Sequence, residues 1–253
     1  MSKINHILKH WPQNSLITTK WLQEKGVSRQ LADSYVKSGW LERFGTGAFK
    51  RPQQKVNRAV GIATLQHVCK LDVHVGGKSA LEALGYAHYI RANTHQPIIL
   101  WKRPDTMLPA WFVNHEWETE STIRAANLFD SNTNILTEKE INGTALGISA
   151  AEQAVLEYLY DLPQYEGFDE ATYLMEGLYS LRPSVLQPLL EQCKSIKVKR
   201  LFLYFGEIYV HAWFKRLDIS NIDLGKGKRT IVKGGSLDKT YQIVVPDIKR
   251  EDQ

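Results

Sequence analysis

The chain has 253 residues, of which 43% are hydrophobic and 23% charged, with a net charge of +5. These proportions are ordinary for a globular protein and exclude a disordered or collagen-like chain. No apolar run approaches the roughly 18 residues that cross a membrane, and residues 1–13 lack the apolar segment of a secretory signal. Cys69 and Cys193 lie far apart, which argues against a disulfide scaffold or a cysteine-based zinc site. We therefore expect a cytoplasmic protein without membrane contacts.

Positive charge is concentrated at the start of the chain. Residues 1–60 hold eleven Lys and Arg against three acids, a net charge of +8, so the other 193 residues carry −3. A basic segment on a nearly neutral body is typical of a protein that binds a polyanion, with nucleic acid the first candidate. The alternative is a solvated basic surface.

Three short helices are predicted in residues 1–40. The first runs from Lys3 to Trp11, and the second begins at Thr18 or Thr19 and ends at Gly26. Ser28 can cap a third helix, which Gly39 terminates. The inward stripe of that helix consists of Leu31, Ala32, Tyr35 and Val36.

Two helices joined by the three-residue turn at 26–28 form a helix-turn-helix pattern. In that geometry the second helix presents its N-terminal residues to the major groove. Arg29 can pair with guanine and Gln30 with adenine.

A basic hairpin is predicted directly after the third helix. Aromatic segments 40–44 and 48–51 flank Gly45-Thr46-Gly47, a typical hairpin turn. Its position is that of the wing in a winged helix-turn-helix, whose cations contact phosphate. The alternative is a helical hairpin with a basic rim. The predicted DNA-binding residues are Ser28, Arg29, Gln30, Lys37, Arg43, Thr46, Lys50 and Arg51.

A connector follows, with a helix over 57–71, a strand over 72–75 and a further helix opened by Gly76-Gly77-Lys78-Ser79. The last motif is not a Walker loop, because position 72, where that pattern needs glycine, is Asp. We favour a structural turn there. The polar stretch at 93–97 marks the boundary between a winged-helix domain at 1–95 and a second domain at 96–253.

The second domain is predicted to be mixed α+β. Short antiparallel strands are expected between 98 and 146, at 98–101, 110–113 and 127–129. Helices are expected at 150–160, capped by Ser149, and at 169–181, 183–193 and 195–214. Strands at 222–224 and 230–232 would flank a hairpin turn at 225–228, and a last strand would cover 241–245.

Basic residues of this domain form a possible second basic face, and the alternative of a solvated rim stays open. These residues are Lys197, Lys199, Arg200, Lys226, Lys228 and Arg229, with Lys194 and Lys233 beside them.

Catalytic and metal-binding patterns are weak. His67, His74 and His88 lack metal-ligand spacing, His211 is expected on a polar helix face, and the acids of 152–176 lack a DxD pattern. No nucleophile elbow or kinase signature is present. We expect neither a catalytic residue, a cofactor nor a metal.

Several blocks of the sequence carry a family likeness. They are residues 31–41, 44–52 and 73–81 in the first part of the chain, and 174–178, 181–183, 197–204 and 232–235 in the second. These blocks resemble the two domains of the AbiEi antitoxins, and the likeness extends over about residues 3–246.

The resemblance implies a winged-helix autorepressor that binds promoter DNA of its own operon at repeated operator sites, as a monomer in solution. It also implies the antitoxin half of a type IV pair of the abortive-infection type, which serves in phage defence. The toxin of such pairs resembles a nucleotidyltransferase and forms no stable complex with the antitoxin. Within the family, DNA reading falls on the third helix and the wing, which match Arg29, Gln30, Lys37, Arg43, Lys50 and Arg51.

Two other functions remain as alternatives. One is an enzyme with its site in the second domain, which predicts a deep pocket with converging acids or histidines. The other is an RNA-binding or protein-docking module that uses the second basic face.

Overall fold

The computed structural model describes residues 2–86, 97–118, 121–130 and 133–247. Helices and strands are interspersed along the chain, so the prediction of a mixed α+β protein is confirmed. The chain divides into two compact units. Unit 1 comprises residues 1–74, 95–125 and 138–147, and unit 2 comprises residues 75–94, 126–137 and 148–253. The predicted boundary stretch lies, except for Pro97, outside the described residues.

The first part of unit 1 begins with three capped helices, as predicted. They are α1 (Lys3–His10), α2 (Thr19–Glu24) and α3 (Arg29–Lys37). The Thr18 hydroxyl accepts a hydrogen bond from the Trp21 amide, and the Ser28 hydroxyl accepts one from the Leu31 amide. Gly39 follows α3 with a φ of +75°, in the left-handed region that glycine adopts without strain.

A small antiparallel sheet completes this part. Its strands are β1 (Ile17–Thr18), β2 (Glu42–Gly45) and β3 (Ala48–Lys50), in the order β1-β3-β2. The predicted hairpin is therefore present, with Thr46 and Gly47 in its turn. Buried Ile7, Trp11, Leu22 and Phe49 share one apolar core with the inward face of α3. Three helices followed by a hairpin is the element order of a winged helix-turn-helix.

The middle of the chain begins with helix α4 (Arg58–Ala63), which continues directly as the π-helix η1 (Thr64–Val68). The Asn57 side chain caps α4 at the Val60 amide. A sheet of order β6-β5-β4-β8-β7 contains the remaining middle strands. They are β4 (Val73–Val75), β5 (Ile98–Lys102), β6 (Ser121–Ala125), β7 (Leu136–Ile141) and β8 (Thr144–Ser149).

Three expectations for the middle of the chain are wrong. Residues 110–113 form helix α6 (Ala110–Val113) after Pro109 rather than a strand, because a four-residue apolar run has no decisive period. Strands β5 and β6 pair in parallel, from Ile98 with Ser121 to Lys102 with Ala125, so a crossover and not a hairpin joins them. Residues 127–129 form no strand.

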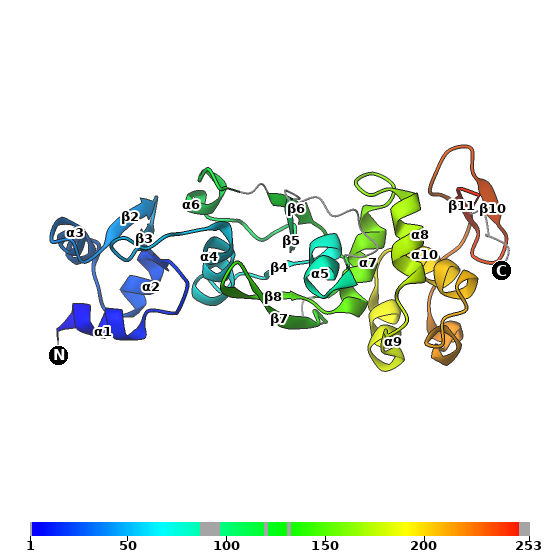
Figure 1. The fold of residues 1–253 in the computed structure, drawn as a ribbon, viewed down its shortest axis with the longest axis horizontal. Coiled ribbons are helices and arrows are strands. Elements are labelled where there is room, and N and C mark those ends of the chain that lie inside the picture. Colours follow the sequence, from blue (N-terminus) through cyan, green and yellow to red (C-terminus); the bar gives the residue numbers. More distant parts are fainter. Residues whose placement is uncertain (1, 87–96, 119–120, 131–132, 248–253) are drawn as a thin grey trace. The chain divides into compact units, whose positions relative to one another are not determined.

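Unit 2 is mainly helical. Helix α7 packs against α5, α9 and α10, and α10 also contacts α8 (Figure 1). The helices are α5 (Gly77–Ala83), α7 (Ala151–Asp161), α8 (Phe168–Glu176), α9 (Pro183–Gln192) and α10 (Ile196–Ile208). Among the described residues, no helix has the length and apolarity that crossing a membrane requires.

Three helix boundaries differ from the expectation. Ser149 does not cap α7, because its hydroxyl donates to the Glu157 carboxylate at 2.8 Å and Ala150 holds the cap position. Helix α8 ends at Glu176 before Gly177, and α10 ends at Ile208. His211 therefore lies beyond α10, buried and bonded to the Met175 carbonyl, and not on a polar helix face.

The last segment carries two 3₁₀ turns and a three-stranded sheet of order β10-β11-β9. The turns are η3 (Phe214–Arg216) and η4 (Ile219–Asn221), and the strands are β9 (Arg229–Thr230), β10 (Ser236–Asp238) and β11 (Ile243–Val245). Residues 222–224 form no strand, so the expected hairpin at 225–228 is wrong. Strand β9 pairs instead with β11, in parallel.

Candidate nucleic-acid interface

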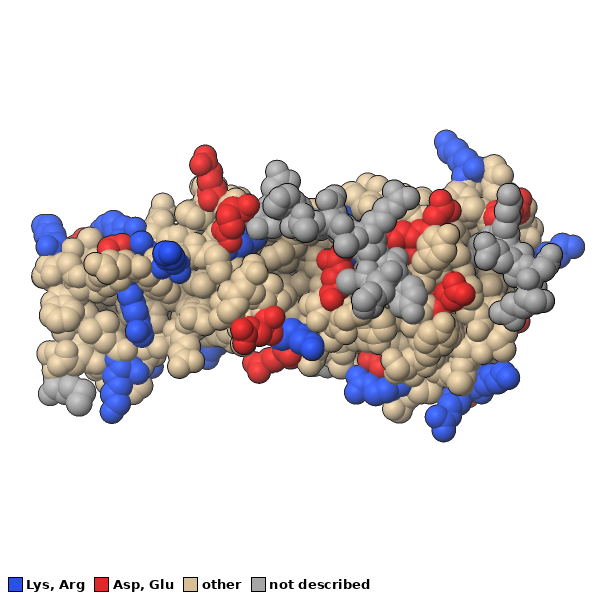
Figure 2. All heavy atoms as spheres, viewed as in Figure 1, with Lys and Arg blue, Asp and Glu red and all other residues tan. Residues whose placement is uncertain are grey.

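The exposed face of α3 carries the residues predicted to read DNA. Arg29, Gln30 and Lys37 are all exposed, whereas Ala32 of the opposite face is 2% exposed. Among the described residues, the side chains of Arg29, Gln30 and Lys37 make no hydrogen bond or ion pair. Figure 2 shows Lys and Arg in blue over the segment that holds α1 to α3. Donors that are not used within the chain are available to an external acceptor.

Ser34 and Asp33 share this face with Gln30. They lie four and three residues after it, the spacings that place side chains side by side on a helix, and both are exposed. Neither residue is among the predicted DNA-binding residues, although their spacing from Gln30 can be read from the sequence. Ser34 thus adds a hydroxyl that can donate to phosphate or to a base edge, and Asp33 adds a negative charge.

An ion pair joins α3 to the wing. Arg43 Nη2 of β2 lies 2.5 Å from Asp33 Oδ1, and the two side chains are 55% and 51% exposed. An ion pair this exposed is worth about 0–1 kcal/mol. Arg43 therefore neutralises the one acid of this helix face and can still exchange partners at low cost.

The other predicted wing residues differ in whether their side chains make contacts within the protein. Lys50 Nζ lies 2.8 Å from Glu42 Oε2, across the register pair of β2 and β3. This hydrogen bond, together with one from the Gln53 amide, lowers the pKa of Glu42. Thr46 is exposed in the turn between the strands. Lys50 is thus partly committed inside the wing, whereas Thr46 is free to contact a ligand.

Arg51 is anchored on α1. Its Nη2 donates to the Leu8 carbonyl at 3.4 Å, and its guanidinium lies 5.2 Å from the centre of the Trp11 ring. This contact orders the chain after the hairpin and leaves Arg51 exposed. The predicted wing cations are therefore pre-oriented by internal contacts, and those of α3 are not.

Aromatic residues of the same unit support the back of the wing. The Phe44 ring lies 4.3 Å from that of His115 and 5.8 Å from that of Trp117, centre to centre. A methyl group at Gly45 would lie 3.0 Å from Trp111 Cβ, so the strand approaches α6 closely. The contacts of residues 111–117 with the wing were not predicted, because no local sequence pattern indicates a contact between residues this far apart in the chain.

Part of the predicted second basic face is buried. Lys199 and Arg200 are each 3% exposed, so including them was wrong. Both side chains point into the protein, where the backbone carbonyls of Asp223 and Leu224 accept their hydrogen bonds. Lys197 Nζ donates to the Tyr160 and Leu162 carbonyls at 2.6 and 2.5 Å. Lys226, Lys228 and Arg229 of the prediction are exposed, as are Lys194 and Lys233 beside them.

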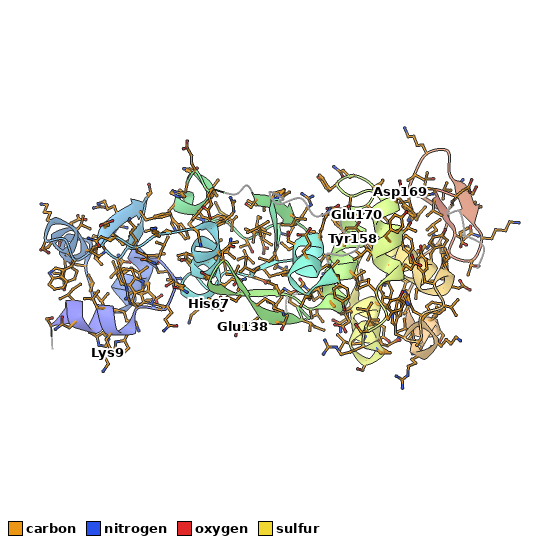
Figure 3. The ribbon with its side chains drawn as sticks, in the orientation of Figure 1. Lys9, His67, Glu138, Tyr158, Asp169 and Glu170 are labelled. Atoms are coloured by element: carbon orange, nitrogen blue, oxygen red, sulfur yellow. The ribbon has the colours of Figure 1, made fainter. Side chains whose placement is uncertain are left out.

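The Gly76-Gly77-Lys78-Ser79 motif is filled by the chain's own carboxylates. The Gly77 amide donates to Glu157 Oε2 at 2.8 Å, and Lys78 Nζ lies 2.8 Å from Glu170 and 3.5 Å from Glu166. Glu170 belongs to α8, and in the view of Figure 3 it lies close to Tyr158 of α7. The Gly77 amide and the Lys78 ammonium group are thus engaged within the chain, which fits the prediction of a structural turn.

Two cavities bear on the enzyme alternative. One of 750 Å³ in unit 1 lies between the wing turn, the start of α2 and the α6 segment, and neither an acid nor a histidine lines it. One of 430 Å³ in unit 2 is lined by Glu207, Asp238 and Asp247 and by no histidine. Within the described ranges, no group of three or more His, Cys, Asp or Glu residues could hold a metal ion.

Comparison with known proteins gives a family and a fold. The sequence model of the family "Transcriptional regulator, AbiEi antitoxin, Type IV TA system" matches residues 95–246, and that of the AbiEi antitoxin N-terminal domain matches residues 1–92. The crystal structure of the RV2827C protein from Mycobacterium tuberculosis is similar over 95% of this chain and 89% of that chain. Its TM-score is 0.60 at 15% sequence identity, which shows a shared fold. No curated protein matches the sequence.

Proposed function

The chain belongs to the AbiEi family of transcriptional regulators, the antitoxins of type IV toxin–antitoxin systems, and on this premise we propose that it represses its own operon by binding promoter DNA. The contact surface consists of the exposed face of α3 in the major groove and the β2–β3 wing on the adjacent backbone. The observation that carries the proposal is the free state of the Arg29, Gln30 and Lys37 side chains on one exposed helix face.

The residues of this surface differ in whether they contact bases or phosphates. Arg29 and Gln30 lie in the first turn of α3, where a recognition helix meets base edges, and they carry sequence preference. Lys37, Arg43, Thr46, Lys50 and Arg51 contact the phosphate backbone and set the register. The capping bond of Ser28 to the Leu31 amide fixes the first turn of the helix, so Ser28 acts by positioning Arg29.

Titration of the chain against its own promoter tests this assignment. The variants Arg29→Ala and Gln30→Ala should each lower operator affinity by about 5- to 150-fold, the effect of about 1–3 kcal/mol per base contact, and should relax sequence preference. Lys139→Ala serves as a matched control, because Lys139 is an exposed cation of β7 far from α3 in sequence. If both α3 variants bind the operator as tightly as the wild type, the assigned surface is wrong.

We also propose that the protein counteracts a nucleotidyltransferase-like toxin without forming a stable complex with it, and that it is a monomer that occupies repeated operator sites. Co-expression with the neighbouring toxin gene should restore growth, while the two purified proteins should elute separately in size-exclusion chromatography. Co-elution at micromolar concentration contradicts the absence of a complex. Light scattering on the same column measures the oligomeric state, and a dimer mass contradicts the monomer.

A further inference from the structure

The cavity of 750 Å³ beside the wing turn is lined only by residues of unit 1. Its walls come from four segments that are far apart in the sequence: the start of α2 (18–20), the wing turn (46–47), residues between 68 and 71 at the end of η1, and the segment 107–114 with α6. Its volume lies within the range of roughly 300–1,000 Å³ that is typical of small-molecule sites. A molecule bound there would contact all four segments at once.

Most of the cavity wall is apolar. Met107 and Val113 at its edge are 87% and 57% exposed, so large apolar side chains there have no covering partner among the described residues. Methionine is unbranched and flexible, and it adapts to ligands of different shape. The wall therefore favours a ligand with an apolar body. Its apolar residues are Val68, Leu71, Met107, Leu108, Pro109, Ala110, Trp111 and Val113.

The polar groups of the wall include a positive charge and, within the described ranges, no negative one. Lys20 is exposed, and its ammonium group has no hydrogen-bond or ion-pair partner among the described residues. The side chains of Thr46 and Asn114 are also exposed, and neither forms a hydrogen bond within the same ranges. An anionic group of a ligand would therefore meet one cation and two hydrogen-bond donors at this wall.

The thiol of Cys69 shows that the charge of Lys20 acts inside the cavity. Cys69 is half-buried in the wall. Burial raises the pKa of its thiol to about 11, and the positive charge of Lys20 opposes this rise. A charge that favours the ionised form of a thiol at the wall also favours the ionised form of a carboxylic acid bound beside it.

The cavity adjoins the part of the wing that we assign to the phosphate backbone. The Gly47 carbonyl accepts a hydrogen bond from the Thr19 amide at 2.9 Å and one from the Thr19 hydroxyl at 3.4 Å. These bonds connect the wing turn to the start of α2, and both lie at the wall of the same cavity. Because like charges repel, an anion bound beside Thr46 opposes the approach of a phosphate to that turn.

We propose that this cavity binds a small organic carboxylate with an apolar body, and that the bound carboxylate lowers the affinity of the wing for DNA. The apolar body lies against Leu71, Leu108 and Trp111, and Lys20 holds the carboxylate. By linkage, bound DNA lowers the affinity for the carboxylate by the same factor. Binding in the cavity is independent of the proposed function, and only the effect on DNA rests on it.

Alkylation of Cys69 by iodoacetamide measures binding to the full-length chain without DNA. The probes are decanoate and naphthoate, an aliphatic and an aromatic carboxylate. At about ten times the dissociation constant, either should slow the alkylation of Cys69 about tenfold, because only the unoccupied fraction reacts. Decanol, which lacks the charge, should protect less, and acetate, which lacks the apolar body, should not protect. Alkylation of Cys193, which is 2% exposed, serves as the internal reference.

Two variants test the assigned contacts. Lys20→Ala should lower the affinity for both carboxylates by about two- to fivefold, the effect of an exposed charge pair, and leave that for decanol unchanged. Lys139→Ala is its matched control, because Lys139 is an exposed cation of β7 in the same unit. Ala110→Trp keeps every charge but fills the cavity from an exposed position at the start of α6, so the protection by decanoate should disappear.

Titration of the operator duplex with and without decanoate measures the effect on DNA. Saturating decanoate should lower operator affinity by about fivefold or more in the wild type, a typical coupling between two sites, and should have no effect in Ala110→Trp. Acetate at the same ionic strength is the control for salt.

Four results overturn the proposal. They are no protection of Cys69 by either carboxylate, an unchanged carboxylate affinity in Lys20→Ala, an unchanged operator affinity at saturating decanoate, and an equal effect of decanoate on wild type and Ala110→Trp. A chain that binds no operator contradicts the proposed function instead. The protection of Cys69, measured without DNA, then still decides whether the cavity binds a carboxylate.

Discussion

Replacing Asp33 by asparagine should strengthen DNA binding. The change removes the negative charge of the exposed α3 face and frees Arg43, whose Nη2 now lies 2.5 Å from Asp33 Oδ1. Both side chains are more than half exposed, so the lost ion pair costs about 0–1 kcal/mol and the domain remains folded. In the complex, the freed Arg43 can then bind a phosphate without competition from Asp33.

The magnitude follows from counterion release. In the wild type, Arg43 divides its charge between Asp33 and the backbone, so its release adds at most one full phosphate contact. That contact steepens the salt dependence by up to about 0.9, which amounts to a further loss of affinity of up to about 3.5-fold between 50 and 200 mM salt. At low salt, Asp33→Asn should therefore bind the operator and an unrelated duplex several times more tightly than the wild type. Because the gain comes from the backbone, it should be similar for both duplexes.

Fluorescence anisotropy with the two duplexes at four salt concentrations measures both quantities. Arg43→Ala is the companion variant, and it should bind less tightly than Asp33→Asn at every salt concentration. A shallower slope for Asp33→Asn, or a loss confined to the operator, would refute the reasoning. The first result would mean that Asp33 is needed to orient Arg43, and the second that Asp33 reads a base.

Two further predictions concern the stability of unit 2. Glu157 is 1% exposed and accepts hydrogen bonds from the Gly77 amide and the Ser149 hydroxyl. Because Glu157→Leu leaves these buried donors without an acceptor, it should lower the free energy of unfolding, measured by urea titration, by about 3 kcal/mol or more. Glu157→Gln should lower it by less. Burial raises the pKa of Glu152, but its hydrogen bonds with Arg182 lower that pKa more, so the net shift is downward. The stabilisation from this pair is present above the unfolded-state pKa and is lost as the pH falls through the folded-state pKa, and Arg182→Ala should remove that part of the acid dependence.

Each of these predictions has a result that contradicts it. Equal unfolding free energies for Glu157→Leu and the wild type would mean that the buried donors find other partners. An unchanged acid limb in Arg182→Ala would mean that the 2.9 Å contact between Arg182 Nε and Glu152 Oε1 does not control this ionisation. A third variant, Lys239→Ala, should change neither measurement, because Lys239 is exposed and its side chain has no partner among the described residues.

Patterns of near neighbours predicted the first 50 residues well. Thr18 and Ser28 cap helices at the expected positions, Gly39 ends α3, and the turn at 45–47 joins two strands. Caps and tight turns are bonds between residues two to four apart, so the sequence alone contains the signal. The position of Arg29, Gln30 and Lys37 on the outward face of α3 follows from the same helical period. The domain boundary at 95 stays a prediction.

Residues whose partners are distant in sequence could not be placed in this way. An apolar run of four residues at 110–113 fits a helix or a strand equally. In the structure it forms helix α6, which packs against β2 of the wing. Lys199 and Arg200 have the sequence context of surface cations, yet carbonyls 24 or more residues away hold them inside. Residues 222–224 form no strand for a similar reason, because Arg200, which is distant in sequence, binds the Leu224 carbonyl.

The amino-acid sequence by itself determined the caps, the turns, the helical period of α3 and the basic character of the first 60 residues, because each depends on bonds or charges close together along the chain. The tertiary structure alone decided which cations are free. Whether a lysine or an arginine faces water or a buried carbonyl depends on the segment that packs against it, and that segment is brought there by folding. Arg200 of α10, which is buried, and Lys226 of the loop that Arg200 contacts, which is exposed, show this contrast.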